Sequence, residues 1–151
     1  MDMQIPLSPL LGSRTAKRMP SILIVDDDLT LLELLSVHLS NGGLQVSVAP
    51  DAAVALRSII ENPPDLIILD IGLPYLDGME VLAALKSDPA SKHIPVIVLT
   101  GHEDPSEYVQ ASNLGADGYL HKPVDREKLI NEIFSRLARQ AAKKIANPPP
   151  A

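Results

Sequence analysis

The chain lacks cysteine and tryptophan, and only one of its 151 residues is phenylalanine. Without cysteine, neither disulfide bonds nor thiolate chemistry is possible. With so few aromatic rings, the chain offers little for stacking on nucleic-acid bases. A long apolar run is missing as well, because residues 5–12 (IPLSPLLG) are too short and too interrupted by proline for a membrane span or a signal peptide. We therefore expect no membrane insertion and a cytoplasmic location.

The net charge of −6 is unevenly distributed along the chain. Residues 1–19 carry +2 and residues 138–151 carry +3, which leaves −11 for residues 20–137. A phosphate backbone repels so acidic a body, and we expect the globular part not to bind nucleic acid directly. The basic ends are expected to serve solubility, and contact with an acidic partner is the alternative.

Strand-like and helix-like apolar patterns alternate along the chain. Strands are predicted at residues 22–25, 44–48, 65–69, 95–99 and 118–120, and a helix follows each of them, the last ending near Leu137. This alternation favours a parallel sheet, and near-continuous aliphatic strands are typical of burial on both faces. We predict a doubly wound α/β domain at 20–138, with a flexible leader at 1–19 and a basic, proline-rich tail at 139–151.

Several aspartates precede the predicted helices and are expected to cap them. Asp28 and Asp125 stand directly before helical patterns. Residues 104–107 (DPSE) are interpreted as an N-cap, a first-turn proline and a capping-box glutamate, Glu107.

Polar side chains follow four of the apolar runs: Asp26 and Asp27, Asp70, Thr100, and Lys122. Because the carboxyl ends of parallel strands meet at one edge of a sheet, these residues are expected to converge there. Three adjacent carboxylates at 26–28 repel one another, by about 1 kcal/mol per close pair in water and about 4 kcal/mol at a protein edge. A hard divalent cation such as Mg²⁺, which prefers oxygen ligands, would offset this repulsion. We predict that Asp26 and Asp27 bind metal beside Asp70.

The other three residues suit phosphoryl chemistry. Asp70 can accept a phosphoryl group to form an aspartyl phosphate. The Lys122 ammonium suits an anionic oxygen, and Pro123 restrains the backbone there and allows a cis bond. The Thr100 hydroxyl can donate a hydrogen bond to a phosphoryl oxygen. Taken singly, these residues also fit a turn, an exposed loop and a strand end, so the prediction depends on their combination.

The chain resembles the receiver domain of bacterial two-component response regulators in one set of residues: Asp26-Asp27, Asp70, Thr100, Lys122-Pro123 and the LPxxDG motif at Leu73–Gly78. Thr100 lies 30 residues after Asp70 and Lys122 lies 52 after it, which matches the family over residues 21–137. The resemblance implies a flavodoxin-like fold with strand order 2-1-3-4-5. It also implies phosphorylation of Asp70 by a sensor histidine kinase or a histidine phosphotransfer protein.

The resemblance implies further roles at the same edge. Asp27, Asp70 and the backbone carbonyl of Gly72 would hold Mg²⁺, with Asp26 as an outer-shell or water-mediated partner. Thr100 and Tyr119 resemble a switch pair, in which the hydroxyl turns toward the phosphoryl group and the ring swings inward. Tyr119 alone is equally consistent with an ordinary amphipathic strand residue.

Three neighbouring positions bear on the lifetime and the output of the phosphorylated state. Gly72 and His102 occupy sites that modulate phosphoryl lifetime in the family, and their net effect stays open. Gly101 is expected to leave room for the phosphoryl group. Output is expected through residues 104–137, as homodimerisation or effector binding.

Other functions remain as alternatives. An aspartate-nucleophile phosphohydrolase places a second Asp two residues after the nucleophile, where this chain has Gly72. A P-loop enzyme needs GxxxxGK[ST], which is missing. A phosphorylation-independent binding module is disfavoured by the intact acidic set. Only fourteen residues follow Leu137, so both a stand-alone receiver and a fragment of a longer protein stay open.

Overall fold

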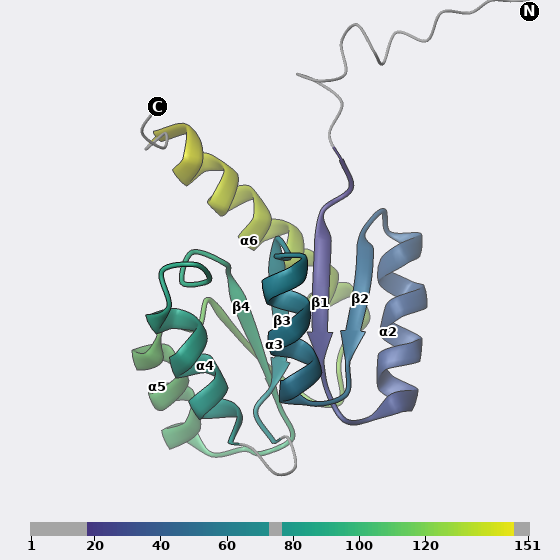
Figure 1. The fold of residues 1–151 in the computed structure, drawn as a ribbon. Coiled ribbons are helices and arrows are strands. Elements are labelled where there is room, and N and C mark those ends of the chain that lie inside the picture. Colours follow the sequence, from purple (N-terminus) through teal and green to yellow (C-terminus); the bar gives the residue numbers. More distant parts are fainter. Residues whose placement is uncertain (1–17, 73–76, 147–151) are drawn as a thin grey trace, which may run out of the picture.

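Five parallel strands form a sheet that carries helices on both faces (Figure 1). The computed structural model describes residues 18–72 and 77–146. The strands are β1 (Ser21–Val25), β2 (Gln45–Ala49), β3 (Leu66–Asp70), β4 (Val96–Thr100) and β5 (Gly118–His121). The helices are α2 (Leu29–Asn41), α3 (Ala52–Glu61), α4 (Gly78–Ser87), α5 (Pro105–Leu114) and α6 (Arg126–Ala146).

The strand order is β2-β1-β3-β4-β5, which confirms the predicted doubly wound, flavodoxin-like arrangement. Val25 pairs with Leu69 across β1 and β3, and Asp70 pairs with Leu99 across β3 and β4. The neighbouring strands therefore end at nearly the same level. Their carboxyl ends, at the arrowheads of Figure 1, form one edge of the sheet.

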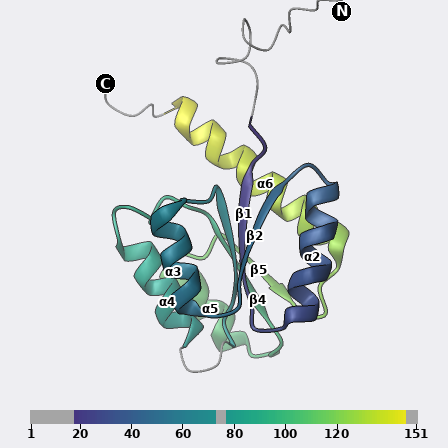
Figure 2. The same cartoon turned by 45° about the vertical axis from the view of Figure 1, so that its right-hand side comes forward.

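Alternate residues of each inner strand enter two separate cores. In β1, Leu23 and Val25 face the core beneath α3, α4 and α5, whereas Ile22 and Ile24 face the core beneath α2 and α6. Figure 2 shows the two groups of helices on opposite sides of the sheet. Because both faces of β1, β3 and β4 are covered, their near-continuous aliphatic sequences are buried throughout.

Aspartates cap all five described helices, and the caps at Asp28, Asp104 and Asp125 confirm the predictions. In the first turns of α2, α3, α4, α5 and α6, backbone N–H groups donate to the side-chain oxygens of, respectively, Asp28, Asp51, Asp77, Asp104 and Asp125. At its other end α5 stops at Gly115, whose φ of 104° is left-handed and favours glycine.

The structure corrects the predicted end of α6. Residues 139–146, assigned above to the basic tail, form about two further helical turns. Their sequence, RQAAKKIA, consists mainly of strong helix formers, and the first proline comes only at Pro148. Residues 1–17 of the predicted leader and residues 73–76 of the LPxxDG motif lie outside the described residues. Within the described chain, no helix combines the length and apolarity needed to cross a membrane.

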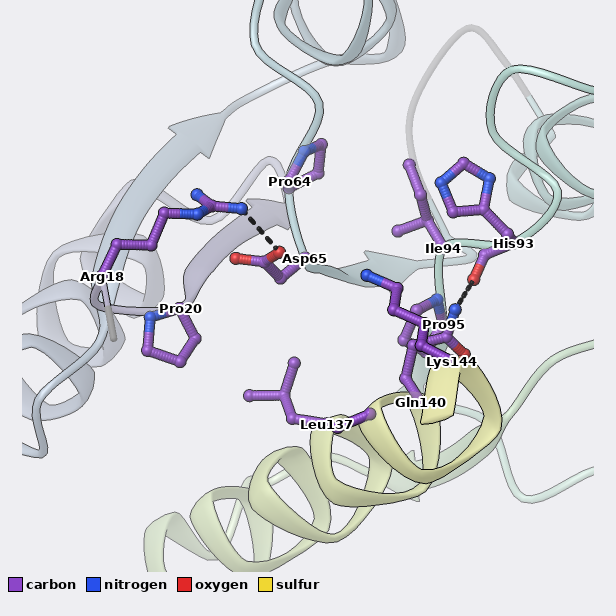
Figure 3. Close-up of a pocket in the computed structure, with 11 residues that line it drawn as sticks. Arg18, Pro20, Pro64, Asp65, His93, Ile94, Pro95, Leu137, Gln140 and Lys144 are labelled. Atoms are coloured by element: carbon purple, nitrogen blue, oxygen red, sulfur yellow. Dashed lines mark hydrogen bonds and ion pairs between the residues drawn. The ribbon is translucent and has the colours of Figure 1, made fainter. Parts of the chain in front are cut away.

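The longer α6 covers the amino-terminal edge of the sheet, where a pocket of about 350 Å³ opens (Figure 3). Leu137, Gln140 and Lys144 line it from α6. Arg18 and Asp65 line it from the starts of β1 and β3 and form an ion pair of 3.1 Å. This pocket lies opposite the edge on which the predicted site residues converge.

Candidate functional site

The three predicted acidic residues come together at the carboxyl edge of the sheet. Asp26 directly follows β1 and is completely buried, and Asp70 ends β3 with 5% of its surface exposed. Asp27 is exposed. One carboxylate oxygen from each of the three lies within 4.8 Å of the others. The predicted convergence of these carboxylates is therefore observed.

Local backbone contacts orient the two buried carboxylates. The Asp28 backbone N–H donates to Asp26 Oδ1 at 3.0 Å, and the Gly72 N–H donates to Asp70 Oδ1 at 2.9 Å. Each turn thus holds one oxygen of its aspartate and leaves Oδ2 for other contacts. Gly78 allows the close packing behind this turn, because a Cβ there would lie 2.3 Å from the Ile71 Cα.

Lys122 contacts both buried carboxylates. Its Nζ lies 2.8 Å from Asp26 Oδ2 and 3.2 Å from Asp70 Oδ2. The backbone N–H of Lys122 donates to the Thr100 carbonyl at 2.7 Å, which extends the pairing of β4 and β5. The Lys122–Pro123 peptide bond is cis, as the sequence allows. The ammonium thus lies between the two buried carboxylates.

Burial and charge shift the pKa values of this group. Burial raises the pKa of Asp26, and the negative charge of Asp70 adds to this effect against the opposing contact with Lys122. Burial alone would lower the pKa of Lys122, but its contacts with Asp26 and Asp70 outweigh burial and raise that pKa. Lys122 therefore stays charged, whereas burial makes the ionised form of Asp26 less favourable than it would be in water.

The donor set fits a hard divalent cation. All three side chains offer carboxylate oxygens, which Mg²⁺ prefers, and one lysine balances only part of their negative charge. Among residues 18–72 and 77–146, Asp26, Asp27 and Asp70 are the one group of three or more acidic or histidine side chains close enough to share an ion. The Gly72 carbonyl as a further ligand stays a prediction.

Thr100 ends β4 at the same edge, but its hydroxyl is engaged on the side of α5. The hydroxyl donates to Glu107 Oε1 at 3.1 Å and accepts the His102 backbone N–H at 3.0 Å. His102 Nδ1 lies 3.1 Å from Glu107 Oε2. A Cβ added at Gly101 would meet no atom of the described residues within 4 Å.

The capping-box prediction for Glu107 is wrong. Its carboxylate turns to Thr100 and His102, while Asp104 caps α5 alone through Ser106. The sequence does not reveal this contact, because a glutamate in the first turn of a helix fits the capping pattern whichever group its carboxylate contacts.

Tyr119 lies in β5 between two other rings. Its centroid is 5.2 Å from that of Tyr108 and 5.5 Å from that of His121, both in edge-to-face geometry. The Tyr119 hydroxyl is buried and has no hydrogen-bond partner among the described residues. Burial raises the pKa of Tyr119, and the nearby charge of Glu107 raises it further. A buried, unpaired hydroxyl therefore lies close to the Thr100–Glu107 contact.

Comparison with known proteins agrees with this geometry. The family model described as "Response regulator receiver domain" matches residues 22–134. The transcriptional regulatory protein KdpE of Mycobacterium tuberculosis is 38% identical over 124 residues, covering 82% of this chain and 54% of its own length. The response regulator MprA of a Mycobacterium species is 41% identical over 118 residues, covering 78% of this chain and 50% of its own length. The chain thus spans about half the length of these curated relatives.

Solved structures of similar sequence share the fold. A CheY-like receiver domain protein from Methanospirillum hungatei is 31% identical, with a TM-score of 0.78 over 83% of this chain and 98% of that chain. A receiver domain protein from Clostridium thermocellum is 33% identical, with a TM-score of 0.76 over 82% and 98%. This chain belongs to the response regulator receiver domains of two-component signalling.

Proposed function

We propose that Asp70 accepts a phosphoryl group from the phosphohistidine of a sensor histidine kinase or a histidine phosphotransfer protein. In this step the P–N bond of the phosphohistidine breaks, and a P–O bond forms to the Asp70 carboxylate. The donor imidazole leaves and takes up a proton. The observation that carries the proposal is the contact of Lys122 Nζ with Asp70 Oδ2, at 3.2 Å, beside two further carboxylates.

The chain's own residues would promote the transfer by position and charge. The Gly72 N–H already orients Asp70 through Oδ1, so that Oδ2 faces Lys122. Lys122 would hold an oxygen of the transferred group, as a compact cation can. Asp27, Asp70 and the Gly72 carbonyl, with Asp26 behind them, would hold Mg²⁺, which when bound supplies charge that stabilises the transferring phosphoryl group.

The main alternative, an aspartate-nucleophile phosphohydrolase, lacks a residue that it needs. Its acid/base would stand two residues after Asp70, and that residue is Gly72, which has no side chain to carry a proton. The aspartyl phosphate would therefore persist as a signal until autodephosphorylation.

Phosphorylation can be tested with acetyl phosphate and with beryllofluoride, each with and without Mg²⁺. Labelling should require Mg²⁺ and should disappear in Asp70→Asn. Asp65→Asn is the matched control. Asp65 directly precedes the same strand, β3, at the opposite edge of the sheet, so this substitution should leave labelling of Asp70 intact. Equal labelling of wild type and Asp70→Asn would contradict the proposal.

The output would pass through α5, β5 and α6, within residues 104–137. A new dianion on Asp70 should attract the Thr100 hydroxyl and the Lys122 ammonium. The Thr100 hydroxyl would then turn away from Glu107 of α5, and the Tyr119 ring would move into the space that the hydroxyl leaves. The acidic body of the domain favours a protein partner here, either a second copy or an effector, over nucleic acid.

Hydrogen exchange measures this output directly. With beryllofluoride, protection should change at residues 100–125 as well as around Asp26 and Asp70. Thr100→Ala should retain labelling of Asp70 but reduce the distant response. Changes confined to the neighbourhood of Asp26 and Asp70 would contradict the proposed coupling.

A further inference from the structure

Glu107 contacts one member of the proposed switch pair, Thr100, and, second to burial, raises the pKa of the other, Tyr119. Its side chain is 23% exposed and projects from the first turn of α5. Oε1 accepts the Thr100 hydroxyl at 3.1 Å, and Oε2 lies 3.1 Å from His102 Nδ1. Both oxygens of this carboxylate are therefore engaged at the end of β4.

The contact with Thr100 has a consequence for phosphoryl recognition. A hydroxyl carries one hydrogen and can donate it to one acceptor at a time. While Thr100 donates to Glu107, it cannot donate to a phosphoryl oxygen on Asp70. A charged acceptor also makes a stronger hydrogen bond than a neutral one. Glu107 therefore competes with the phosphoryl group for the Thr100 hydroxyl.

Tyr119 offers Glu107 a second hydroxyl donor. Its hydroxyl is buried and unpaired among the described residues, which is an unfavourable state for a donor. The Glu107 carboxylate is near enough to raise the pKa of Tyr119, after the larger effect of burial. If Thr100 turned away, an oxygen of Glu107 would lose its donor while an unpaired donor lay close by.

We infer that Glu107 exchanges hydroxyl partners: it accepts from Thr100 in the resting protein and from Tyr119 after phosphorylation of Asp70. The exchange keeps the carboxylate paired and satisfies the buried phenol. It also fixes the Tyr119 ring in its inward position. Glu107 is thus a positioning residue, which acts through Thr100 and Tyr119 and not on the phosphoryl group. This inference rests on the proposed function of Asp70.

The resting half of the exchange is tested by the methyl NMR signal of Thr100. In Glu107→Ala the signal should move part of the way toward its position in the wild-type beryllofluoride complex. Phosphorylation by acetyl phosphate should become about fivefold faster, because the competing hydrogen bond is lost. Glu103→Ala, which removes an exposed acid from the loop before α5, should change neither quantity, and Glu107→Gln should lie between Glu107→Ala and wild type.

The second half is tested by a double-mutant cycle of Glu107→Ala and Tyr119→Phe, measured as midpoints of urea unfolding. In the resting protein the two substitutions should be nearly additive, since Glu107 accepts from Thr100 and, second to burial, only raises the pKa of Tyr119. In the beryllofluoride complex they should not be additive, since either one removes the same hydrogen bond. The Tyr119 ring signals should also respond less to beryllofluoride in Glu107→Ala than in wild type.

The outcomes separate this inference from the function on which it rests. A wild-type protein that did not respond to beryllofluoride would overturn both. If wild type responds, an unmoved Thr100 signal in Glu107→Ala would overturn the exchange alone. Additive effects at 107 and 119 in the complex would do the same, and phosphorylation of Asp70 would still stand.

Discussion

The two edges of the sheet each carry an aspartate at one end of β3, with Asp65 just before the strand and Asp70 as its last residue, but the two aspartates make different contacts. Asp65, at the amino-terminal edge, accepts the Ser21 backbone N–H at 2.7 Å and the Ser21 hydroxyl at 3.2 Å, and it pairs with Arg18. Asp70, at the carboxyl edge, faces two further carboxylates and shares one lysine with Asp26. Donors surround the first aspartate, whereas acceptors crowd the second.

This contrast indicates which edge of the sheet is suited to chemistry. The amino-terminal edge has the pocket of about 350 Å³ in Figure 3, yet its aspartate joins two strands and is satisfied. The carboxyl edge has an excess of buried negative charge and raised pKa values at Asp26 and Lys122. Excess negative charge favours the binding of a cation and reaction with an electrophile. In this fold, unbalanced charge therefore indicates the reactive site better than cavity volume does.

Removing Lys122 should produce the largest effect. In Lys122→Ala the buried Asp26 loses its ion partner, and we expect a loss of about 2 kcal/mol of stability at neutral pH, below the value for a fully buried pair because Lys122 is a quarter exposed. Labelling of Asp70 should fall at least about tenfold, since the cation for the phosphoryl oxygen is gone. Lys128→Ala, at an exposed position on α6, is the control.

The pH dependence of Lys122→Ala has a definite sign. The pKa of Asp26 is already raised by burial, and losing the ammonium should raise it further. The folded state then binds a proton more tightly than the unfolded state does. The variant should therefore regain stability as pH falls, and lose it as pH rises through the folded pKa. Urea unfolding at acidic and neutral pH measures this, and a deficit independent of pH would contradict the assignment to Asp26.

Asp65→Ala should reverse the pattern at the other edge. It leaves the Ser21 N–H without its acceptor, and we expect a loss of about 1–2 kcal/mol of stability. Labelling of Asp70 and Mg²⁺ affinity should stay at wild-type values in the folded fraction. A comparable loss of labelling would show that the two edges are not independent.

Asp27→Ala tests whether repulsion among the carboxylates at the carboxyl edge destabilises the metal-free protein. Mg²⁺ affinity should fall, whereas stability without metal should rise by up to about 1 kcal/mol, the value for a close pair of like charges in water. Calorimetric titration and thermal unfolding without metal measure the two effects, with Glu33→Ala on the exposed side of α2 as control. Unchanged Mg²⁺ affinity would move the metal site, and an unchanged melting temperature would contradict only the crowding argument.

The convergence of Asp26, Asp70 and Lys122 could be predicted because it depends on local patterns. Aliphatic runs alternating with helical stripes indicate parallel strands, and parallel strands bring their carboxyl ends together whatever the loops do. The strand order followed from the family resemblance. Each polar residue needed only to stand at a strand end.

The partner of Glu107 and the end of α6 could not be predicted in the same way. The first depends on how residues 101–104 turn α5 against β4, and several turns fit that sequence. The second depends on helix propensity beyond Leu137, where the apolar stripe used to find the helix becomes weak. Contacts set by loop geometry, or by segments without a periodic signal, are decided in three dimensions.

Gln140→Ala is expected to have the smallest effect, and it tests whether the extended α6 matters to the opposite edge. Gln140 Nε2 donates to the His93 carbonyl at 2.8 Å beside the pocket of Figure 3. Losing this exposed bond should cost about 0.5 kcal/mol, and alanine's higher helix propensity offsets part of that. Arg139→Ala, one residue earlier, gives the propensity effect alone, so the difference between the variants isolates the bond. Because no charge at the carboxyl edge changes, labelling of Asp70 should be unaffected. A change in labelling that Arg139→Ala does not share would mean that α6 transmits strain across the sheet, and the separation of a structural edge from a reactive one would fail.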